Sequence, residues 1–136
     1  MEKISVKTTS RTDFIDITEK VRAVAAKSNV KDGICYLFCP HTTAGLTINE
    51  NADPSVQMDI NDTLNRLIPH NANYRHSEGN SDGHIKSSLF GVSLNVFIEN
   101  GALSLGTWQG IYFVEGDGPR TREVWVKILG SEKLEV

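Results

Sequence analysis

The feature that most limits the fold of this sequence is a run of short apolar segments separated by turn sequences in its last third. Asn100-Gly101 is a strong signal for a two-residue hairpin turn, and Gly116-Asp117-Gly118-Pro119 marks a second turn. Strands joined by such turns lie side by side and run antiparallel. The strands expected here are residues 89–98, 102–107, 111–114 and 120–129. This part of the chain therefore predicts an antiparallel sheet.

The first half of the chain adds four strands and two helices. Strands are expected at residues 4–8, 14–17, 34–39 and 46–48, and the nearly continuous apolar character of the third favours burial on both faces. Thr18 is expected to cap one helix, and Asp53-Pro54 has the residue types that begin a second helix, ending at Pro69. The order of elements predicts an α+β fold: a compact mixed, largely antiparallel β-sandwich with two helices.

The length and composition are those of one globular domain spanning residues 1–136. Apolar residues make up 39% of the chain and charged residues 23%. The net charge of -3 gives no overall field that would attract nucleic acid. The sequence has no signal-peptide pattern and no apolar run of the roughly 20 residues that a membrane helix needs. We therefore expect a cytoplasmic protein without nucleic-acid or membrane partners.

The two cysteines, Cys35 and Cys39, lie on the same predicted strand. Four residues of strand separate their α-carbons by about 13 Å. A disulfide needs less than about 7 Å. We therefore expect two buried, reduced thiols.

Polar side chains that could take part in catalysis or ligand binding are concentrated in two blocks. The first block runs from His41 to Asp59. His41 follows a buried strand, where a side chain can point into a cleft as a ligand or general base, or form only a local hydrogen bond. Asp53 has a structural role as a helix cap. Glu50 and Asp59 have no comparable structural role, although Asp59 also fits a solvated helix face. The candidate catalytic residues of this block are His41, Glu50 and Asp59.

The second block runs from Tyr74 to Lys86 and contains His76 and His84. The histidine spacing matches no compact metal motif. If His41 joins these two histidines in space, neutral imidazoles with a carboxylate would suit a divalent ion of the zinc type. The sequence thus predicts that both blocks share one site. His70, beside Pro69, is expected to be a surface loop residue.

Two further groups complete the candidates. Trp108 and Gln109 lie at a tight turn and could give a planar ligand a stacking wall and an amide contact, or Trp108 could pack on the core or at a subunit contact. Arg120 and Arg122 share one face of the last predicted strand. Their guanidinium groups suit phosphate binding. The alternative is that the two arginines form ion pairs with Glu115, Asp117 or Glu123.

Taken together, these motifs resemble the YjbQ family, whose members include proteins described as secondary thiamin-phosphate synthases and many of unknown function. The resemblance covers essentially the whole chain. The motifs that carry it are His41-Thr42-Thr43-Ala44, Glu50-Asn51-Ala52-Asp53, Asp59, Tyr74-x-His76, Gly83-His84, Leu105-Gly106-Thr107-Trp108-Gln109 and Glu115-Gly116-Asp117-Gly118-Pro119-Arg120-x-Arg122.

The resemblance implies a homotrimer with a site near the subunit contacts, often with a bound metal ion. It also implies an activity that joins a pyrimidine diphosphate to a thiazole phosphate and releases diphosphate. We expect a divalent cofactor, zinc-like or magnesium, and a small phosphorylated metabolite as ligand. The expected site has catalytic, substrate-binding and metal-ligating residues: catalytic His41, Glu50, Asp59, Arg120 and Arg122; substrate-binding Tyr74, Thr107, Trp108 and Gln109; metal-ligating His41, His76 and His84.

Two other functions remain open at this stage. A zinc-type ion could instead activate water for hydrolysis of a phosphorylated metabolite. Alternatively, the chain could form a non-catalytic trimer that binds a small anion. The number of polar residues expected in the site favours catalysis over such a scaffold.

Overall fold

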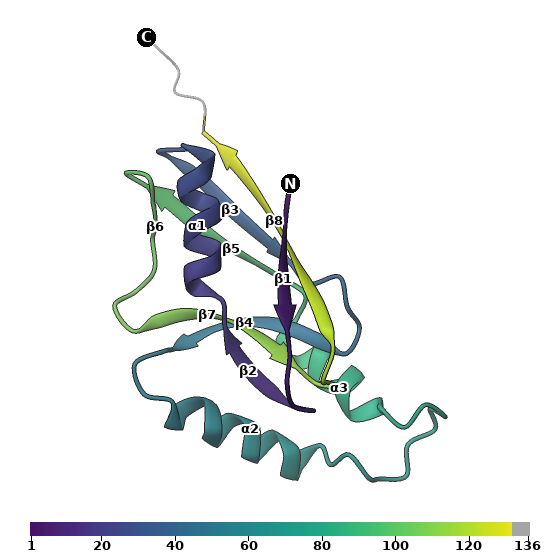
Figure 1. Ribbon diagram of the computed structural model, residues 1–136. Coiled ribbons are helices and arrows are strands. Elements are labelled where there is room, and N and C mark those ends of the chain that lie inside the picture. The colour runs from purple at the N-terminus through teal and green to yellow at the C-terminus, as the bar shows by residue number, and fades with distance from the viewer. Residues whose placement is uncertain (132–136) are drawn as a thin grey trace.

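The computed structural model describes residues 1–131, which form three helices and eight strands (Figure 1). In chain order the elements are β1 Glu2–Lys7, β2 Asp13–Asp16, α1 Thr18–Ser28, β3 Gly33–Phe38, β4 Ala44–Glu50, α2 Ser55–Leu67, α3 Ser81–Phe90, β5 Ser93–Glu99, β6 Ala102–Leu103, β7 Gln109–Glu115 and β8 Thr121–Gly130. The α+β prediction is confirmed, and the expectation of two helices is corrected to three.

Two antiparallel sheets form the β-structure. The larger has the strand order β1-β8-β3-β5-β6, and the smaller has the order β2-β7-β4. The longest strand, β8, lies between β1 and β3, and its Val126 stands opposite Leu37 of β3. The inner faces of both sheets form one core, which includes Leu37, Leu46, Ile98, Ile111, Phe113 and Val126.

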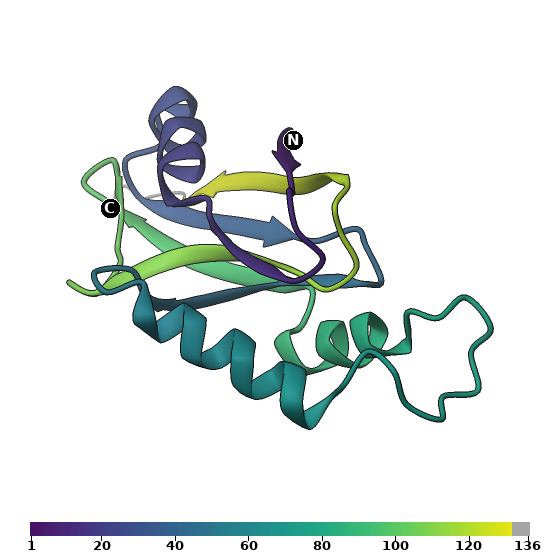
Figure 2. The same ribbon diagram turned by 60° about the horizontal axis from the view of Figure 1, so that its bottom comes forward.

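The helices lie at different places around this core. Figures 1 and 2 show α1 beside the larger sheet and α2 running along the smaller sheet, with α3 at the end where β7 turns into β8. None of the helices among residues 1–131 is long and apolar enough to cross a membrane.

Carboxylates fix the first turns of α1 and α2. The Asp16 carboxylate accepts both the backbone N–H and the hydroxyl of Thr18, at 2.9 and 2.5 Å, so Asp16 does the capping that we expected of Thr18. The Thr18 hydroxyl oxygen instead accepts the backbone N–H of Ile111 at 2.8 Å, which ties α1 to β7. At α2 the Asp53 carboxylate accepts the N–H of Ser55 at 2.9 Å, and this bond lowers the pKa of Asp53.

Strand β3 is buried on one face only, contrary to the expectation of two covered faces. Cys35 and Leu37 point into the core, while Tyr36 and Phe38 are each 43% exposed. Aromatic and apolar side chains also lie exposed on neighbouring strands of the larger sheet, at Phe97 and Leu129. The continuous apolar run therefore reflects an exposed apolar outer face of this sheet.

Helix α3 includes Leu89 and Phe90, which corrects the expectation of a strand that begins at residue 89. Its buried residues are mainly polar, among them Asp82, Lys86 and Ser87, whereas Ile85 and Leu89 are exposed. This reverses the amphipathic pattern by which a surface helix is predicted. Gly91, with a φ of 91°, ends the helix, and β5 begins two residues later.

Two glycines allow α3 to approach the turn between β7 and β8 without an intervening side chain. A Cβ atom at Gly83 would lie 2.8 Å from the carbonyl oxygen of Gly116. A Cβ atom at Gly116 would lie 2.8 Å from the carbonyl oxygen of Thr43. This contact sets the distance between α3 and the first residues of β8.

Candidate functional site

A polar pocket of about 430 Å³ lies where β3 ends, α3 begins and β8 starts. Its lining comes from segments far apart in the sequence: Pro40, His41, Thr42, Thr43, His76, Glu78, Asn80, His84, Arg120 and Arg122. The structure thus places residues of both polar blocks, and both arginines, around one pocket.

Beneath the pocket, Arg122 and Glu115 form a buried ion pair. The side chain of Arg122 is 5% exposed and that of Glu115 is fully buried. Arg122 donates to both carboxylate oxygens of Glu115 and to the hydroxyl of Thr43. Burial alone would raise the pKa of Glu115, but hydrogen bonds from Arg122, Thr8 and the backbone of Asp117 hold it below 4.5. Glu115 therefore stays charged and fixes the Arg122 guanidinium.

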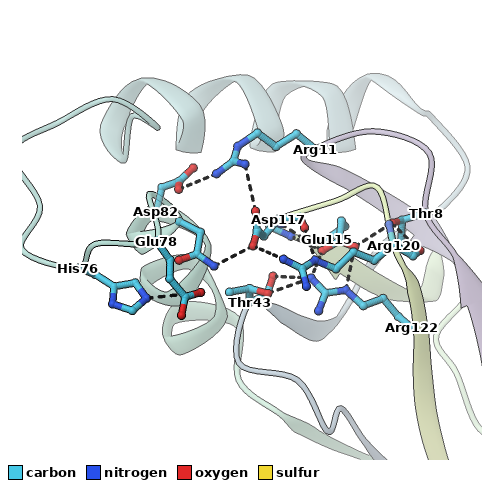
Figure 3. A network of polar contacts seen from close by, with 12 residues as sticks. Thr8, Arg11, Thr43, His76, Glu78, Asp82, Glu115, Asp117, Arg120 and Arg122 are labelled. Atoms are coloured by element: carbon cyan, nitrogen blue, oxygen red, sulfur yellow. Dashed lines mark hydrogen bonds and ion pairs between the residues drawn. The ribbon is translucent and has the colours of Figure 1, made fainter.

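A second group of ion pairs centres on Asp117 (Figure 3). Its carboxylate accepts bonds from Arg11 at 3.0 Å, from Arg120 at 2.8 Å and from the Asn80 amide at 2.8 Å. Arg11 also pairs with Asp82 of α3 at 2.9 Å, and the Asp82 side chain is 1% exposed. The three bonds to Asp117 offset its burial and lower its pKa. Arg11 thus links α3 to the turn that carries Arg120.

The charges within this network balance. Three guanidinium groups, Arg11, Arg120 and Arg122, face three carboxylates, Asp82, Glu115 and Asp117. Arg120 uses Nε and Nη2 to bond the carbonyl and carboxylate of Asp117, and its side chain is 53% exposed. In the described chain its Nη1 makes no hydrogen bond, so this edge of the guanidinium is free for a ligand.

His41 lies at the pocket wall with one ring nitrogen already committed. Its Nε2 accepts the backbone N–H of Glu123 at 2.9 Å. An accepting Nε2 carries no proton, so a neutral ring holds its proton on Nδ1. Burial and the charge of Arg122 lower the pKa of His41 from 6.5. His41 therefore has neither nitrogen free as a metal ligand in this arrangement.

His76 and His84 pack against each other in the lining of the pocket. Their ring centroids are 5.3 Å apart and the rings are nearly perpendicular, while His76 Nε2 lies 4.0 Å from the Glu78 carboxylate. Two imidazoles and a carboxylate are the ligand types of zinc sites. Among residues 1–131 no three His, Cys, Asp or Glu side chains lie close enough together to hold an ion as placed. By ligand chemistry, His76, His84 and Glu78 are the residues that would hold a metal.

One pocket-lining atom lacks a hydrogen-bond partner. Asn80 is 8% exposed, its Nδ2 donates to Asp117, and its Oδ1 is buried without a donor among residues 1–131. Leaving a buried acceptor unpaired costs free energy unless a bound group satisfies it. A ligand N–H, a water molecule or a cation would complete this position.

Comparison with known proteins identifies the family of this chain. A family model described as UPF0047 protein YjbQ-like matches residues 2–131. This chain belongs to the YjbQ-like family. It is 55% identical over 130 residues to a UPF0047 protein of Methanocaldococcus jannaschii, covering 96% of this chain and 94% of the relative. It is 48% identical over 132 residues to the UPF0047 protein YugU of Bacillus subtilis, covering 96% and 99%.

Solved structures of YjbQ-like proteins share the fold. A crystal structure of an uncharacterised YjbQ/UPF0047 protein from Clostridium acetobutylicum superposes with a TM-score of 0.93 at 55% identity, covering 95% of this chain and all of the other. A protein of unknown function from Sulfolobus solfataricus superposes with a TM-score of 0.91 at 32% identity, covering 96% of each chain. These two proteins are described as uncharacterised or of unknown function, so family membership fixes the fold without fixing an activity.

The YjbQ-like fold separates several of the expected site residues from this pocket. Glu50 lies at the far end of β4, where its carbonyl accepts the Gln57 amide, and Asp59 is exposed on α2. Thr107 and Trp108 lie in the turn before β7 and Gln109 is the first residue of β7, with Trp108 63% exposed. None of these five residues lines the pocket. Tyr74 lines an adjoining pocket with His76 and His84.

Three residues that line the pocket or its ion-pair network were not among the predicted site residues: Glu78, Asn80 and Arg11. Glu78 and Asn80 lie inside the second polar block, so their position beside His76 was a usable signal. Arg11 had no such signal, since its partners Asp82 and Asp117 are 71 and 106 residues away in sequence. The alternative that we gave for the two arginines is observed: Arg120 forms an ion pair with Asp117, and Arg122 forms one with Glu115.

Proposed function

We propose that this protein is an enzyme that acts on a small phosphorylated metabolite bound in the polar pocket. The observation that carries the proposal is the lining itself, in which three histidines and the free edge of Arg120 share a pocket of about 430 Å³. A pocket of this size holds one small molecule. A purely structural role would not require so many polar groups in a solvent-accessible hollow.

The phosphate end of the ligand is assigned to Arg120. Its guanidinium is already held by two bonds to Asp117, so little side-chain freedom is lost when a phosphate binds Nη1. Because the nearby ion pairs balance, the additional charge of a phosphate needs a further cation. Protonated His76 or His84, or a divalent ion, would supply it.

The histidine pair provides the proton chemistry. Imidazoles titrate near neutral pH and act as general acids and bases. His76, His84 and Glu78 would also hold a divalent ion, zinc-like or magnesium, and such an ion when bound would stabilise negative charge on phosphate oxygens. The neutral, clamped His41 shapes the wall and offers its Nδ1–H as a hydrogen-bond donor.

The first reaction to test is of the thiamin-phosphate synthase type. A ring nitrogen of a thiazole phosphate attacks the methylene carbon of a pyrimidine diphosphate, forming a C–N bond as the C–O bond to diphosphate breaks. The released diphosphate carries the electron pair of that bond, and Arg120 is placed to stabilise its charge. This assignment of Arg120 supports a reaction with a phosphate leaving group.

The experiment is an assay of purified protein with the two precursors and magnesium, following thiamin phosphate and diphosphate. Arg120→Ala and His84→Ala should each reduce the rate by roughly 100-fold if these residues act in the reaction. Arg22→Ala is the matched control, since Arg22 lies on α1 and its one ion pair among residues 1–131 is with Glu19. Absence of turnover, or variants as active as the control, would remove this reaction.

Hydrolysis of a phosphorylated metabolite is the second candidate, favoured by the position of Glu78 beside His76, whose ring packs against that of His84. Here a zinc-type ion would lower the pKa of a bound water. Elemental analysis measures the metal content of the untagged wild-type protein and of His76→Ala. Wild-type protein without stoichiometric metal would argue against metal-dependent hydrolysis. Tight anion binding with no turnover of any phosphate ester would instead identify a non-catalytic anion-binding protein.

We also propose a homotrimer located in the cytoplasm. The exposed aromatic face of the larger sheet, with Tyr36, Phe38 and Phe97, is the kind of surface that subunit contacts cover. Cys35 and Cys39 are buried free thiols, which suits a reducing compartment. Burial raises the pKa of Cys35 to about 11, so this thiol is inert at neutral pH.

A further inference from the structure

We propose that this protein has a second ligand site, separate from the polar pocket, that binds a small carboxylate. The site is a pocket of about 380 Å³ between the connection from β1 to β2, the end of α2 and the start of α3. None of its lining residues lines the polar pocket. The polar residues of its lining are Arg11, Thr12, Asn65, His70, Asn71 and Asp82.

His70 gives this pocket a hydrogen-bond donor. Its Nδ1 lies 2.7 Å from Nη2 of Arg11, closer than the 3.3 Å to the Asp82 carboxylate. A guanidinium can only donate, so Nδ1 is the acceptor and the neutral ring carries its proton on Nε2. The side chain is 44% exposed, and Nε2 makes no hydrogen bond to another residue in the described chain. The Nε2–H group is therefore open to a ligand acceptor.

Thr12 gives the pocket a second donor by the same reasoning. The ammonium group of Lys86 can only donate, and it bonds Oδ1 of Asn65. The other end of the Asn65 amide, Nδ2, therefore donates to the Thr12 hydroxyl oxygen at 3.2 Å. Because that oxygen is the acceptor, the hydroxyl hydrogen is left to donate, and residues 1–131 provide no acceptor for it.

Lys86 also leaves one positive charge without a counter-charge beside this pocket. The three guanidinium groups and three carboxylates of the ion-pair network balance, and Arg11 is shared between Asp82 and Asp117 (Figure 3). Lys86 is 4% exposed and forms no ion pair within residues 1–131. Burial lowers the pKa of Lys86, and the charge of Asp82 offsets this effect only in part. A bound anion would stabilise the ammonium group.

Two free donors and one surplus positive charge match a carboxylate. A carboxylate carries one negative charge and two acceptor oxygens, and it has no hydrogen that needs an acceptor. The acceptor atoms of Thr12, Asn65 and His70 are already occupied, and Asp82 is paired with Arg11. A phosphate dianion would add a second negative charge that this site does not balance.

Backbone amide NMR titrations with acetate and acetamide test the proposal. The two probes have nearly the same size, but acetamide is neutral and carries donor hydrogens. Acetate should shift the amide signals of Thr12, Asn65 and Asn71 with a Kd on the order of 1–10 mM. Acetamide should bind roughly tenfold more weakly, because it lacks the charge that strengthens both hydrogen bonds.

Substitutions at Thr12 isolate one of the two donors. Thr12→Val removes the hydroxyl group at nearly constant volume and should weaken acetate binding roughly tenfold. Thr12→Ser keeps the hydroxyl group and should bind acetate as wild type does. Thr63→Val is the matched control, since Thr63 is an exposed residue of α2 that does not line the pocket.

The contrary results are distinct from those that test the polar pocket. Equal shifts with acetate and acetamide, or a Thr12→Val protein that binds acetate as tightly as wild type, would overturn the second site. Acetate shifts that disappear in Arg120→Ala and persist in Thr12→Val would place the carboxylate in the polar pocket and would also overturn it. None of these outcomes contradicts the proposed function, which is tested by turnover of phosphorylated substrates.

Discussion

The ring of His41 accepts the backbone N–H of Glu123 through Nε2 at 2.9 Å, and this bond joins the end of β3 to the first residues of β8. It fixes the proton of the neutral ring on Nδ1. The bond therefore constrains both the geometry of the pocket wall and the protonation state of His41.

A pH dependence of stability follows from this bond. Because burial and Arg122 lower the pKa of His41 below 6.5, the unfolded chain binds a proton more readily than the folded chain. Stability should be highest above pH 6.5 and fall as the pH drops from 6.5 through the folded pKa. His41→Gln keeps an acceptor for the Glu123 N–H but does not titrate, so wild type should lose stability relative to this variant. Urea unfolding across this pH range measures the difference, and NMR titration giving a folded pKa of 6.5 or above would contradict it.

The Arg122–Glu115 pair predicts strong coupling between two substitutions. Arg122→Met leaves the Glu115 carboxylate buried without its counter-charge, which should cost about 3–5 kcal/mol of unfolding free energy. Adding Glu115→Gln removes that uncompensated charge, so the double variant should lose clearly less than the sum of the two single variants. Urea unfolding of wild type, the two single variants and the double variant gives the double-mutant cycle. Additive losses of unfolding free energy would refute the coupling.

Acid should weaken the fold through the same pair. The pKa of Glu115 is held below 4.5, so its contribution is fully present above pH 4.5 and is lost as the pH falls through the folded pKa. In the double variant this part of the acid sensitivity should be absent. An unchanged acid unfolding curve would show that Glu115 does not contribute to it.

The contact between Gly83 and Gly116 predicts a substitution that damages stability and the site together. Gly83→Ala places a Cβ atom 2.8 Å from a backbone oxygen, which forces α3 away and should cost roughly 1–3 kcal/mol. Because α3 carries His84, phosphate affinity should also fall. Gly130→Ala is the control, since its Cβ would meet nothing closer than 3.6 Å. Thermal unfolding and phosphate titration are the measurements, and a Gly83→Ala protein equal to the control would contradict the close packing.

The proposed trimer predicts a mass and a way to change it. Sedimentation should give three times the chain mass of 15.0 kDa. Phe97, 60% exposed on the outer face of the larger sheet, is the residue to alter, and Phe97→Lys should lower the mass by placing a charge within the contact. Glu99→Lys is a control at an exposed position on the same strand. A wild-type mass of one chain would refute the trimer.

The strands were largely predictable because their signals are local. Asn100-Gly101 determines a hairpin from two residues, and alternation of apolar side chains marks a strand within a few positions. Helix α3 was not predictable in this way, because its buried face carries Asp82 and Lys86, whose partners come from other elements. The exposed Tyr36 and Phe38 misled the prediction for β3, since apolar residues on an outer sheet face resemble a buried strand.

The pocket was predictable only in part. Histidines and paired arginines indicate chemistry by their type, so His41, His76, His84 and Arg120 were found from the sequence. Glu50, Asp59 and Trp108 have equally suitable side chains, but the fold carries them elsewhere. Arg11 owes its importance to Asp82 and Asp117, and such distant pairings require the tertiary structure.

The ion-pair network around Asp117 has a consequence for how the protein folds. Two bonds in and beside this network join positions 106 and 107 residues apart: Arg11 with Asp117 and Thr8 with Glu115. No short fragment of the chain contains both halves of this network, so the pocket assembles only when the first and last strands have found each other. Ligand recognition and completion of the fold are therefore one cooperative event, and a bound ligand would protect the whole molecule against unfolding rather than a single loop.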